Sequence, residues 1–274
     1  MKKFTIKKIT LSILLLFISV ITIYPFIWMI FSSFKMNKEI VLINQTFLPK
    51  VFSLENYLKA GKNFNFFRYF LNSLIISFSV TTIIVYTSTI CGYVFSKYRF
   101  RGRKFLFSFV LSTMMIPWCV TIIPKYSLID FLGWMDSYKA LIIPLVFSGF
   151  GIFLMKQFIE SIPDAIIDAA KIDGANEFVI LHRLIFPMSR SGISSLAIFQ
   201  FLWEWEDFLW PYLTINTSKK QLLPVGLKMF SGQYSTDYGS LFAATTISIV
   251  PVLVVYFIFQ NQFITGLVSS AVKG

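Results

Sequence analysis

Three carboxylates stand beside three tryptophans in the apolar stretch 201–213. The six residues are Trp203, Glu204, Trp205, Glu206, Asp207 and Trp210. Tryptophan rings can pack against the C–H faces of a polyhydroxylated ligand, while carboxylates accept hydrogen bonds from its hydroxyl groups. Carboxylates at membrane depth are costly unless they face protein or water, so the pattern favours a substrate pathway. An aromatic belt with solvated carboxylates at the membrane surface is the alternative.

The spacing of these carboxylates predicts that they do not all lie on one helix face. Glu204 and Asp207 are three positions apart and can share one helix face, whereas Glu206 is directed elsewhere, so we expect at least one of the three to be structural. Unit charges about 4 Å apart interact by about 4 kcal/mol at an effective dielectric of about 20. A neutral or weakly cationic saccharide is therefore expected, and an acidic one is disfavoured unless a partner chain supplies cations.

A second informative segment, residues 163–187, is polar but keeps helical periodicity. A short helix is expected to start at Pro163, a favoured first helical position, and to stop at Gly174, which tolerates the left-handed conformation. The wheel places Asp164, Asp168 and Lys171 on one face of this helix and alanine-rich positions on another. Such a helix suits docking into another protein.

A further short helix is expected to follow, with Asn176 as its cap. Phe178, Leu181 and Ile185 would lie along one side of it, and Pro187 would end it. The two short helices and the glycine between them form one helix–turn–helix element.

Several kinds of chemistry are missing. The single histidine, His182, has no second histidine or cysteine pair nearby. It is therefore expected to be a polar loop residue, and not a metal ligand or a general base that activates a nucleophile. No G-x-x-x-x-G-K-S/T phosphate loop, G-x-S-x-G elbow or H-E-x-x-H pair occurs, so neither ATP hydrolysis nor proteolysis is expected. Cys91 and Cys119 should lie near opposite ends of different spans, and no disulfide is expected. We therefore expect no catalytic, metal or cofactor site.

The rest of the chain is apolar enough to need lipid as its solvent. Its 274 residues are 56% hydrophobic, with a mean hydropathy of +0.70. Six stretches can cross about 30 Å of hydrocarbon, and they are expected at 10–32, 71–95, 104–124, 138–158, 191–213 and 240–262. The prediction is an all-α membrane protein in which residues 1–274 form a single integral-membrane domain with six transmembrane helices.

The net charge of +12 is dispersed between these spans, which fits membrane orientation better than nucleic-acid binding. The loop 96–104 carries five cations and the N-terminus four lysines, so both are expected in the cytoplasm. The loop 33–70 also carries cations, which weakens this bias without reversing it. Six spans then place both termini and the loop 159–190 in the cytoplasm.

The loop 159–190 resembles the cytoplasmic coupling loop of ATP-binding-cassette importer permeases. The family's hallmark is an acidic residue, two alanines, two variable residues, Asp-Gly-Ala, and then an apolar-rich run to a proline. The matching residues are Asp168, Ala169, Ala170, Asp173, Gly174, Ala175 and Pro187. Asp168 stands where the family most often has Glu. The resemblance implies that these residues couple the chain to an ATPase, and a generic amphipathic surface loop is the alternative.

The resemblance covers nearly the whole chain and narrows to permease subunits of carbohydrate importers of the maltose-transporter type. The matching segments are 54–57, 72–73, 114–117, 223–226, 236–239, Pro251 and 271–274. In span five the family shows Trp-Asn-(Asp/Glu)-Phe-x-x-Pro; here Trp205 is followed by Glu206 in place of the usual Asn, which leaves the ligand open.

The resemblance implies a multi-pass protein of the bacterial cytoplasmic membrane, surrounded by lipid, that works by alternating access. Its implied partners are a second homologous permease subunit, two copies of a cytoplasmic ATP-binding subunit that would hold ATP and Mg, and an extracytoplasmic sugar-binding protein. The binding protein would face residues 214–239. The alternatives are a permease for a non-sugar polar solute, a passive channel or secondary carrier, and a scaffold that transports nothing.

Overall fold

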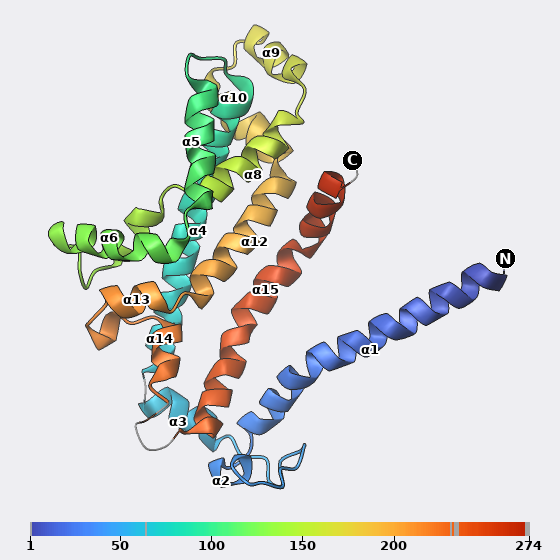
Figure 1. Cartoon of the computed structure of the whole chain (residues 1–274), viewed down its shortest axis with the longest axis vertical. Coiled ribbons are helices and arrows are strands. Elements are labelled where there is room, and N and C mark those ends of the chain that lie inside the picture. Colours follow the sequence, from blue (N-terminus) through green and yellow to red (C-terminus); the bar gives the residue numbers. More distant parts are fainter. Residues whose placement is uncertain (1, 64, 231, 233–235, 272–274) are drawn as a thin grey trace. The chain divides into compact units, whose positions relative to one another are not determined.

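The computed structural model describes residues 2–63, 65–230, 232 and 236–271, with the backbone alone for residues 2–7, 63 and 261–271. Residues 272–274 of the closing segment matched above therefore lie outside the described residues. Every regular element in the described part is a helix (Figure 1). The α-helices are α1 (Lys2–Ser33), α2 (Asn37–Ile40), α3 (Glu55–Asn63), α4 (Phe66–Lys97), α5 (Arg103–Met115), α6 (Trp118–Phe131), α7 (Tyr138–Ile142), α8 (Gly149–Glu160), α9 (Asp164–Ile172), α10 (Glu177–Ile180), α11 (Phe186–Met188), α12 (Arg190–Glu206), α13 (Leu209–Thr214), α14 (Leu223–Lys228) and α15 (Tyr238–Ala271).

Three of these helices match predicted spans as continuous apolar rods. They cover Lys8–Ser33, Phe66–Lys97 and Tyr238–Gln260, and correspond to the predictions 10–32, 71–95 and 240–262. The all-helical prediction is confirmed for the described residues.

The predicted span 104–124 is not one straight helix. It is divided into α5 and α6, which meet at an angle of 101°. The break lies at Ile116, whose extended backbone (φ −82°, ψ 118°) precedes Pro117, because proline excludes the helical conformation from the residue before it. The two helices together are a broken span or a re-entrant loop.

Two more predicted spans are interrupted. Residues 138–158 correspond to Tyr138–Leu145 and α8, which are bent by 42°. Residues 191–213 correspond to α12 and α13. Helix α12 stops at Glu206, because Asp207 adopts an extended conformation (ψ 116°). Among the described residues, three helices are long and apolar enough to cross a membrane, or up to five if each bent pair counts as one span.

By its internal contacts the chain forms two compact units, which are described separately. The first comprises the chain up to Phe67 with Gly226–Val250, and the second comprises Arg68–Val225 and the chain from Pro251 onward. In the first unit, the buried Asn56 side chain donates to the carbonyl oxygens of Ser33 (2.8 Å) and Lys35 (2.7 Å). A Cβ on Gly239 would stand 2.6 Å from Asn56 Oδ1, so only glycine fits there.

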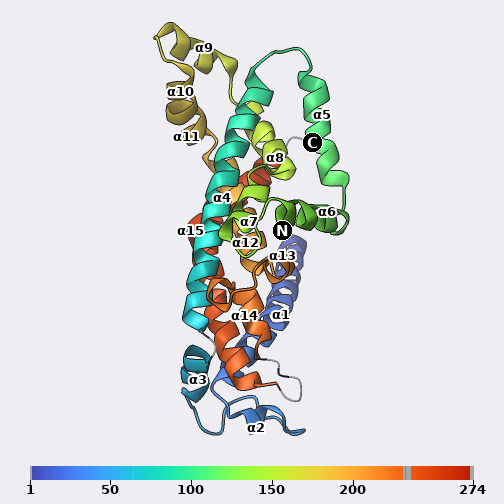
Figure 2. The same ribbon diagram turned by 90° about the vertical axis from the view of Figure 1, so that its left-hand side faces the viewer.

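In the second unit, α4 packs closely against α8 (Figure 2). A Cβ on Gly92 would lie 2.8 Å from the backbone nitrogen of Lys156, and one on Gly151 would lie 2.3 Å from Ser88 Oγ. Small residues that let backbones approach are the usual way for membrane helices to associate. Tyr93 of α4 enters a buried cluster with α8 and the segment that follows it.

Candidate functional site

The six residues of the aromatic–acidic segment lie at the junction of α12 and α13 but do not face one place. Trp205 is buried, in edge contact with Phe70 (5.6 Å between ring centres) and stacked on Phe201 (5.8 Å). Trp210 is also buried, and its Nε1 donates to the carbonyl oxygen of Ala140 at 2.9 Å. Two of the three tryptophans are therefore core residues.

The carboxylates divide by position. Glu204 accepts a hydrogen bond from Gln200 Nε2 (2.8 Å), and Asp207 accepts one from the backbone nitrogen of Trp210 (3.4 Å) at the start of α13. Glu204 and Asp207 both line a cavity of about 10 Å³, large enough for one water molecule at most. Glu206 is exposed, as is Trp203 with an exposed fraction of 52%. Of the six residues, only these last two are exposed in this chain.

Lys125 of α6, which was not predicted from the sequence as a site residue, completes this cluster. Its Nζ lies 3.9 Å from the centre of the Trp210 ring, and it interacts electrostatically with Asp207 and Glu204. The chain itself thus supplies a cation to these carboxylates, which weakens the expected exclusion of acidic sugars. A lysine at the end of an apolar stretch, directly after Pro124, was the signal available in the sequence.

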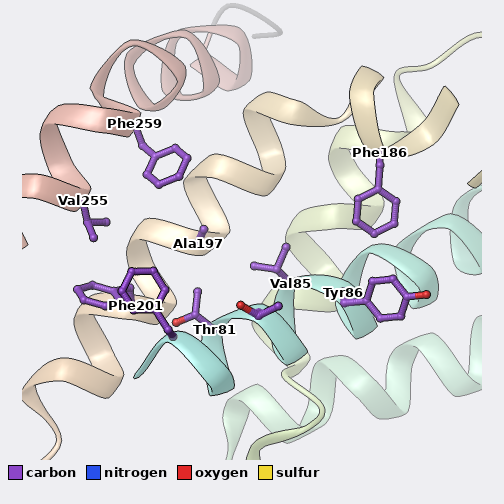
Figure 3. A pocket seen from close by; sticks show the side chains of 10 residues that line it. Thr81, Val85, Tyr86, Phe186, Ala197, Phe201, Val255 and Phe259 are labelled. Carbon is purple, nitrogen blue, oxygen red and sulfur yellow. The ribbon is translucent and has the colours of Figure 1, made fainter. Parts of the chain in front are cut away.

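The larger cavity lies elsewhere in the second unit and has a volume of about 280 Å³ (Figure 3). Its lining is mainly apolar and comes from α4, α11, α12 and α15; the residues are Phe78, Thr81, Thr82, Val85, Tyr86, Phe186, Ala197, Phe201, Val255 and Phe259. Thr81 Oγ1 is buried and has no hydrogen-bond partner within the described part of the chain. The six predicted residues do not line this cavity.

The segment matched to the coupling loop forms α9, a turn and α10. Pro163 directly precedes α9. Gly174 has φ +83°, and two turn hydrogen bonds close the helix end: Gly174 N to Lys171 O (3.0 Å) and Ala175 N to Ala170 O (2.9 Å). This pair is the Schellman arrangement, which needs a left-handed residue. The predicted helix stop is confirmed.

The start of the second helix is also confirmed, since Asn176 Oδ1 accepts from the backbone nitrogen of Val179 at 2.9 Å. Its further course was predicted wrongly. Leu181 and Ile185 are buried, but Phe178 is 67% exposed. A π-helical turn over Leu181–Ile185 changes the register and accommodates Pro187, so that helical structure continues to Met188 instead of ending at the proline.

The turn and both of its helices present a mixed surface. Asp168, Ala169 and Asp173 are exposed, and Ile167 alone in α9 is buried. Ile166, Ile172 and Phe178 also leave more than a third of their surface uncovered in this chain. Exposed apolar residues rimmed by charges mark an interaction surface.

His182 lies in this region as a polar packing residue. Its ring is 4.0 Å from that of Phe178 and stacks on Phe186, and its Nε2 is 3.3 Å from Tyr86 Oη. Among the described residues, histidine, cysteine and carboxylates nowhere group as a metal site would require. Cys91 and Cys119 are free thiols.

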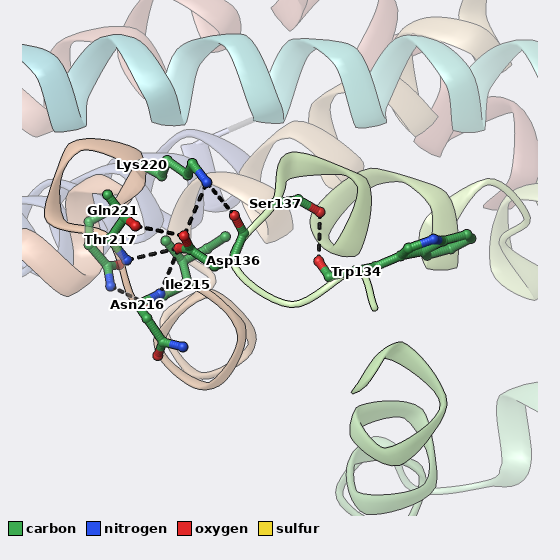
Figure 4. A network of polar contacts seen from close by, with 8 residues as sticks. All are labelled: Trp134, Asp136, Ser137, Ile215, Asn216, Thr217, Lys220 and Gln221. Atoms are coloured by element: carbon green, nitrogen blue, oxygen red, sulfur yellow. Dashed lines mark hydrogen bonds and ion pairs between the residues drawn. The ribbon is translucent and has the colours of Figure 1, made fainter. Parts of the chain in front are cut away.

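A polar latch joins the turn after α6 to the segment after α13 (Figure 4). Asp136 accepts hydrogen bonds from the backbone nitrogens of Asn216 (3.0 Å) and Thr217 (2.8 Å), from Thr217 Oγ1 (2.6 Å) and from Lys220 Nζ (3.0 Å). The hydroxyl of Thr217 is the largest cause that holds the pKa of Asp136 well below its ordinary range. This latch fixes residues 215–220, the first part of the loop expected to face a binding protein.

The described helices include several that are long and apolar enough to cross a membrane, and the comparisons identify the class of protein. The chain belongs to the family of binding-protein-dependent transport system inner membrane components, whose pattern matches residues 85–267. It is 31% identical over 276 residues to the arabinooligosaccharides transport system permease protein AraQ of Bacillus subtilis, covering 99% of this chain and 98% of that protein. It is 35% identical over 260 residues to the diacetylchitobiose uptake system permease protein NgcG of Streptomyces coelicolor, covering 93% and 85%.

Among solved structures, the fold matches a chain of a bacterial ABC transporter involved in the import of the acidic polysaccharide alginate. The TM-score is 0.84 at 23% identity, with 94% of this chain and 97% of that chain covered. A second match, with a TM-score of 0.67 and 15% identity, comes from a bacterial alginate ABC transporter in complex with its pentasaccharide-bound periplasmic protein. Both matches show the fold.

Proposed function

We propose that the chain is the transmembrane subunit of an ATP-driven oligosaccharide importer of the bacterial cytoplasmic membrane. The observation that carries this proposal is the exposed α9–Gly174–α10 element, which presents Asp168, Ala169 and Asp173 in the spacing typical of a coupling loop. The saccharide class is supported by the names of AraQ and NgcG, which concern arabinooligosaccharides and diacetylchitobiose. ATP and Mg would be held by the partner ATPase and not by this chain.

The proposed topology has six crossings with both termini in the cytoplasm. Three crossings would be the continuous helices α1, α4 and α15, two would be the bent pairs, and the sixth would be α12 with α13. The charge pattern of the loop 96–104 supports the orientation. The α9–α10 element would then lie on the side of the membrane where ATP is found.

The proposed transport cycle depends on a pair of permease subunits, two ATPase subunits and an extracytoplasmic binding protein. Closure of the ATPases would move α9, and the spanning helices would reorient between outward and inward states. Of the residues predicted for the pathway, Trp203 and Glu206 are exposed in this chain and are the ones proposed to meet the sugar. A non-sugar polar solute is the runner-up substrate, and a passive channel the runner-up mechanism.

Co-purification tests the coupling role. The detergent-solubilised complex should retain its ATPase subunits with the wild-type chain and lose most of them with Asp168→Lys, which reverses an exposed charge. Asp168→Asn, which removes the charge without reversing it, should give an intermediate yield. Equal ATPase recovery from all three complexes would place docking elsewhere, and no ATPase in any of them would favour the channel.

A further inference from the structure

We propose that Glu177 is a positioning residue that fixes α9 to the end of α4. When α9 is displaced, the two helices would then move together as one rigid body. The inference rests on the proposed function, because it treats α9 as the helix that receives the ATPase. It concerns contacts inside this chain, beyond the residues that would touch the partner. The relevant groups lie on α4, α9 and α10, at the end of the second unit where α4 stops (Figures 1 and 2).

Glu177 is the first residue of α10, directly after the Asn176 cap. Its Oε2 accepts a hydrogen bond from Tyr93 Oη of α4 at 3.0 Å, and its Oε1 forms an ion pair with Lys171 Nζ of α9 at 3.0 Å. Tyr98, just beyond α4, also hydrogen-bonds to this carboxylate. One side chain therefore bridges the end of α4 and α9, which are far apart in sequence.

The groups around Glu177 support one another. The rings of Tyr93 and Tyr98 meet edge to face with 5.4 Å between their centres, and Lys171 Nζ lies 5.4 Å from the Tyr98 ring centre. The hydrogen bond from Tyr98 is the largest cause that lowers the pKa of Glu177 below its ordinary value. The bridging group is thus a carboxylate anion at neutral pH.

A second link holds the other end of α9. Lys97, the last residue of α4, has a nearly buried side chain (7% exposed) whose Nζ forms an ion pair with Asp164 Oδ1 at 2.6 Å and donates to the carbonyl oxygen of Ile162. Asp164 is the first residue of α9. Between the two links, Ile167 packs in the same buried cluster as Tyr93. The helix is therefore fastened near both ends, with an apolar contact between.

The helix that receives these links also lines the large cavity. Tyr93 is about 18 Å along α4 from Thr81 at a rise of 1.5 Å per residue, and both Thr81 and Val85 line the 280 Å³ cavity. α4 is one continuous helix without proline, whereas α1 and α15 contain Pro25 and Pro251. A displacement of α9 would therefore reach the cavity wall without passing a kink.

The test uses the reconstituted transporter with wild-type, Glu177→Ala, Glu160→Gln and Asp168→Lys chains. Three quantities are measured: recovery of the ATPase subunits, ATP hydrolysis, and sugar transported per ATP hydrolysed. Glu160 is the matched control, since its ion pair with Lys156 (2.7 Å) stays within α8. Glu177→Ala should keep ATPase recovery and lower transport per ATP by about fivefold or more, while Glu160→Gln should behave as wild type.

A wild-type ratio of transport to hydrolysis in Glu177→Ala, with Asp168→Lys deficient in ATPase recovery, would overturn the inference and leave the proposed function standing. Normal ATPase recovery in Asp168→Lys would instead place docking elsewhere, and absence of ATPase from the wild-type complex would count against the proposed function. Tyr93→Phe is the second variant, since it removes one hydroxyl and keeps the buried ring. If Glu177→Ala does not assemble, a reduced ratio in Tyr93→Phe supports the inference and an unchanged ratio overturns it.

Discussion

The Lys125 ammonium lies 3.9 Å from the centre of the Trp210 ring and interacts electrostatically with the carboxylates of Asp207 and Glu204. This contact joins α6, beyond the bend at Pro117, to α13, beyond the break at Asp207. Two interruptions of the helical spans therefore meet at one group of charges. Removing one partner of such a group leaves the others uncompensated, which costs more than removing the whole group.

Lys125→Met is accordingly expected to lower the thermal stability of the detergent-solubilised protein, and a second change, Asp207→Asn, should recover part of the loss. A coupling of about 1 kcal/mol is expected between charges that interact within one group. Lys125→Arg should stay close to wild type because it keeps the charge. The measurement is the unfolding midpoint of the wild type and of four variants: Lys125→Met, Asp207→Asn, the two changes combined, and Lys125→Arg. Purely additive losses in the double variant would show that the charges do not interact.

Gly239 provides a test of the first unit, because a Cβ there would stand 2.6 Å from Asn56 Oδ1. Gly239→Ala must displace the buried Asn56 amide, which donates hydrogen bonds to the carbonyl oxygens of Ser33 and Lys35. The change should destabilise the protein by about 1–3 kcal/mol. Gly61→Ala is the control, since a Cβ at that helical position meets nothing within 4 Å. Thermal unfolding of both variants checks this. Equal behaviour of the two would mean that the Asn56 contact is not rigid.

The Asp136 latch gives a pH dependence. The folded-state pKa of Asp136 is lowered, first by the Thr217 hydroxyl, so its stabilising contribution is complete above the ordinary carboxyl range and is lost as pH falls through the lowered value. Hydrogen exchange of residues 215–221 should therefore stay slow from neutral pH to well below pH 4, about the pKa of a free aspartate. Asp136→Asn should exchange faster across the whole range. Equal protection in the variant at neutral pH would contradict the latch.

The orientation can be checked by thiol labelling of intact cells in a background without Cys91 and Cys119. A cysteine at Arg101 should resist an impermeant reagent because it lies in the cation-rich loop, whereas one at Lys219 should react. Both positions are exposed in the structure, so accessibility from each side of the membrane decides the result. The reverse labelling pattern would invalidate both the topology and the assignment of the α9–α10 element.

Local signals in the sequence predicted the turn between α9 and α10 well. Gly174 and Asn176 act through backbone geometry within a few residues of themselves, so their roles can be recognised without knowing the fold. Pro187 was predicted to end the helix. The π-helical turn before it accommodates the backbone hydrogen bond that proline cannot donate, so helical structure continues past it. Phe178, which precedes this turn, was predicted on the buried side but is exposed.

Hydropathy located the apolar stretches but not their continuity. An apolar window averages over Ile116 and Pro117, whose backbone conformations separate α5 from α6. The orientation of Trp205 and Trp210 depends on Phe70 and Ala140, far away in sequence, and no local pattern contains that information. Lys125 was overlooked for the same reason, because its partners lie on α12 and α13 and become neighbours only in the fold.

The most direct test of the account is sugar uptake by proteoliposomes that contain this chain, its permease and ATPase partners and the binding protein. The account predicts that labelled oligosaccharide accumulates only when ATP is inside the vesicles with the ATPase subunits, and that Asp168→Lys abolishes the accumulation. Equilibration of the sugar without ATP, or ATP-driven uptake that is indifferent to Asp168→Lys, would contradict it.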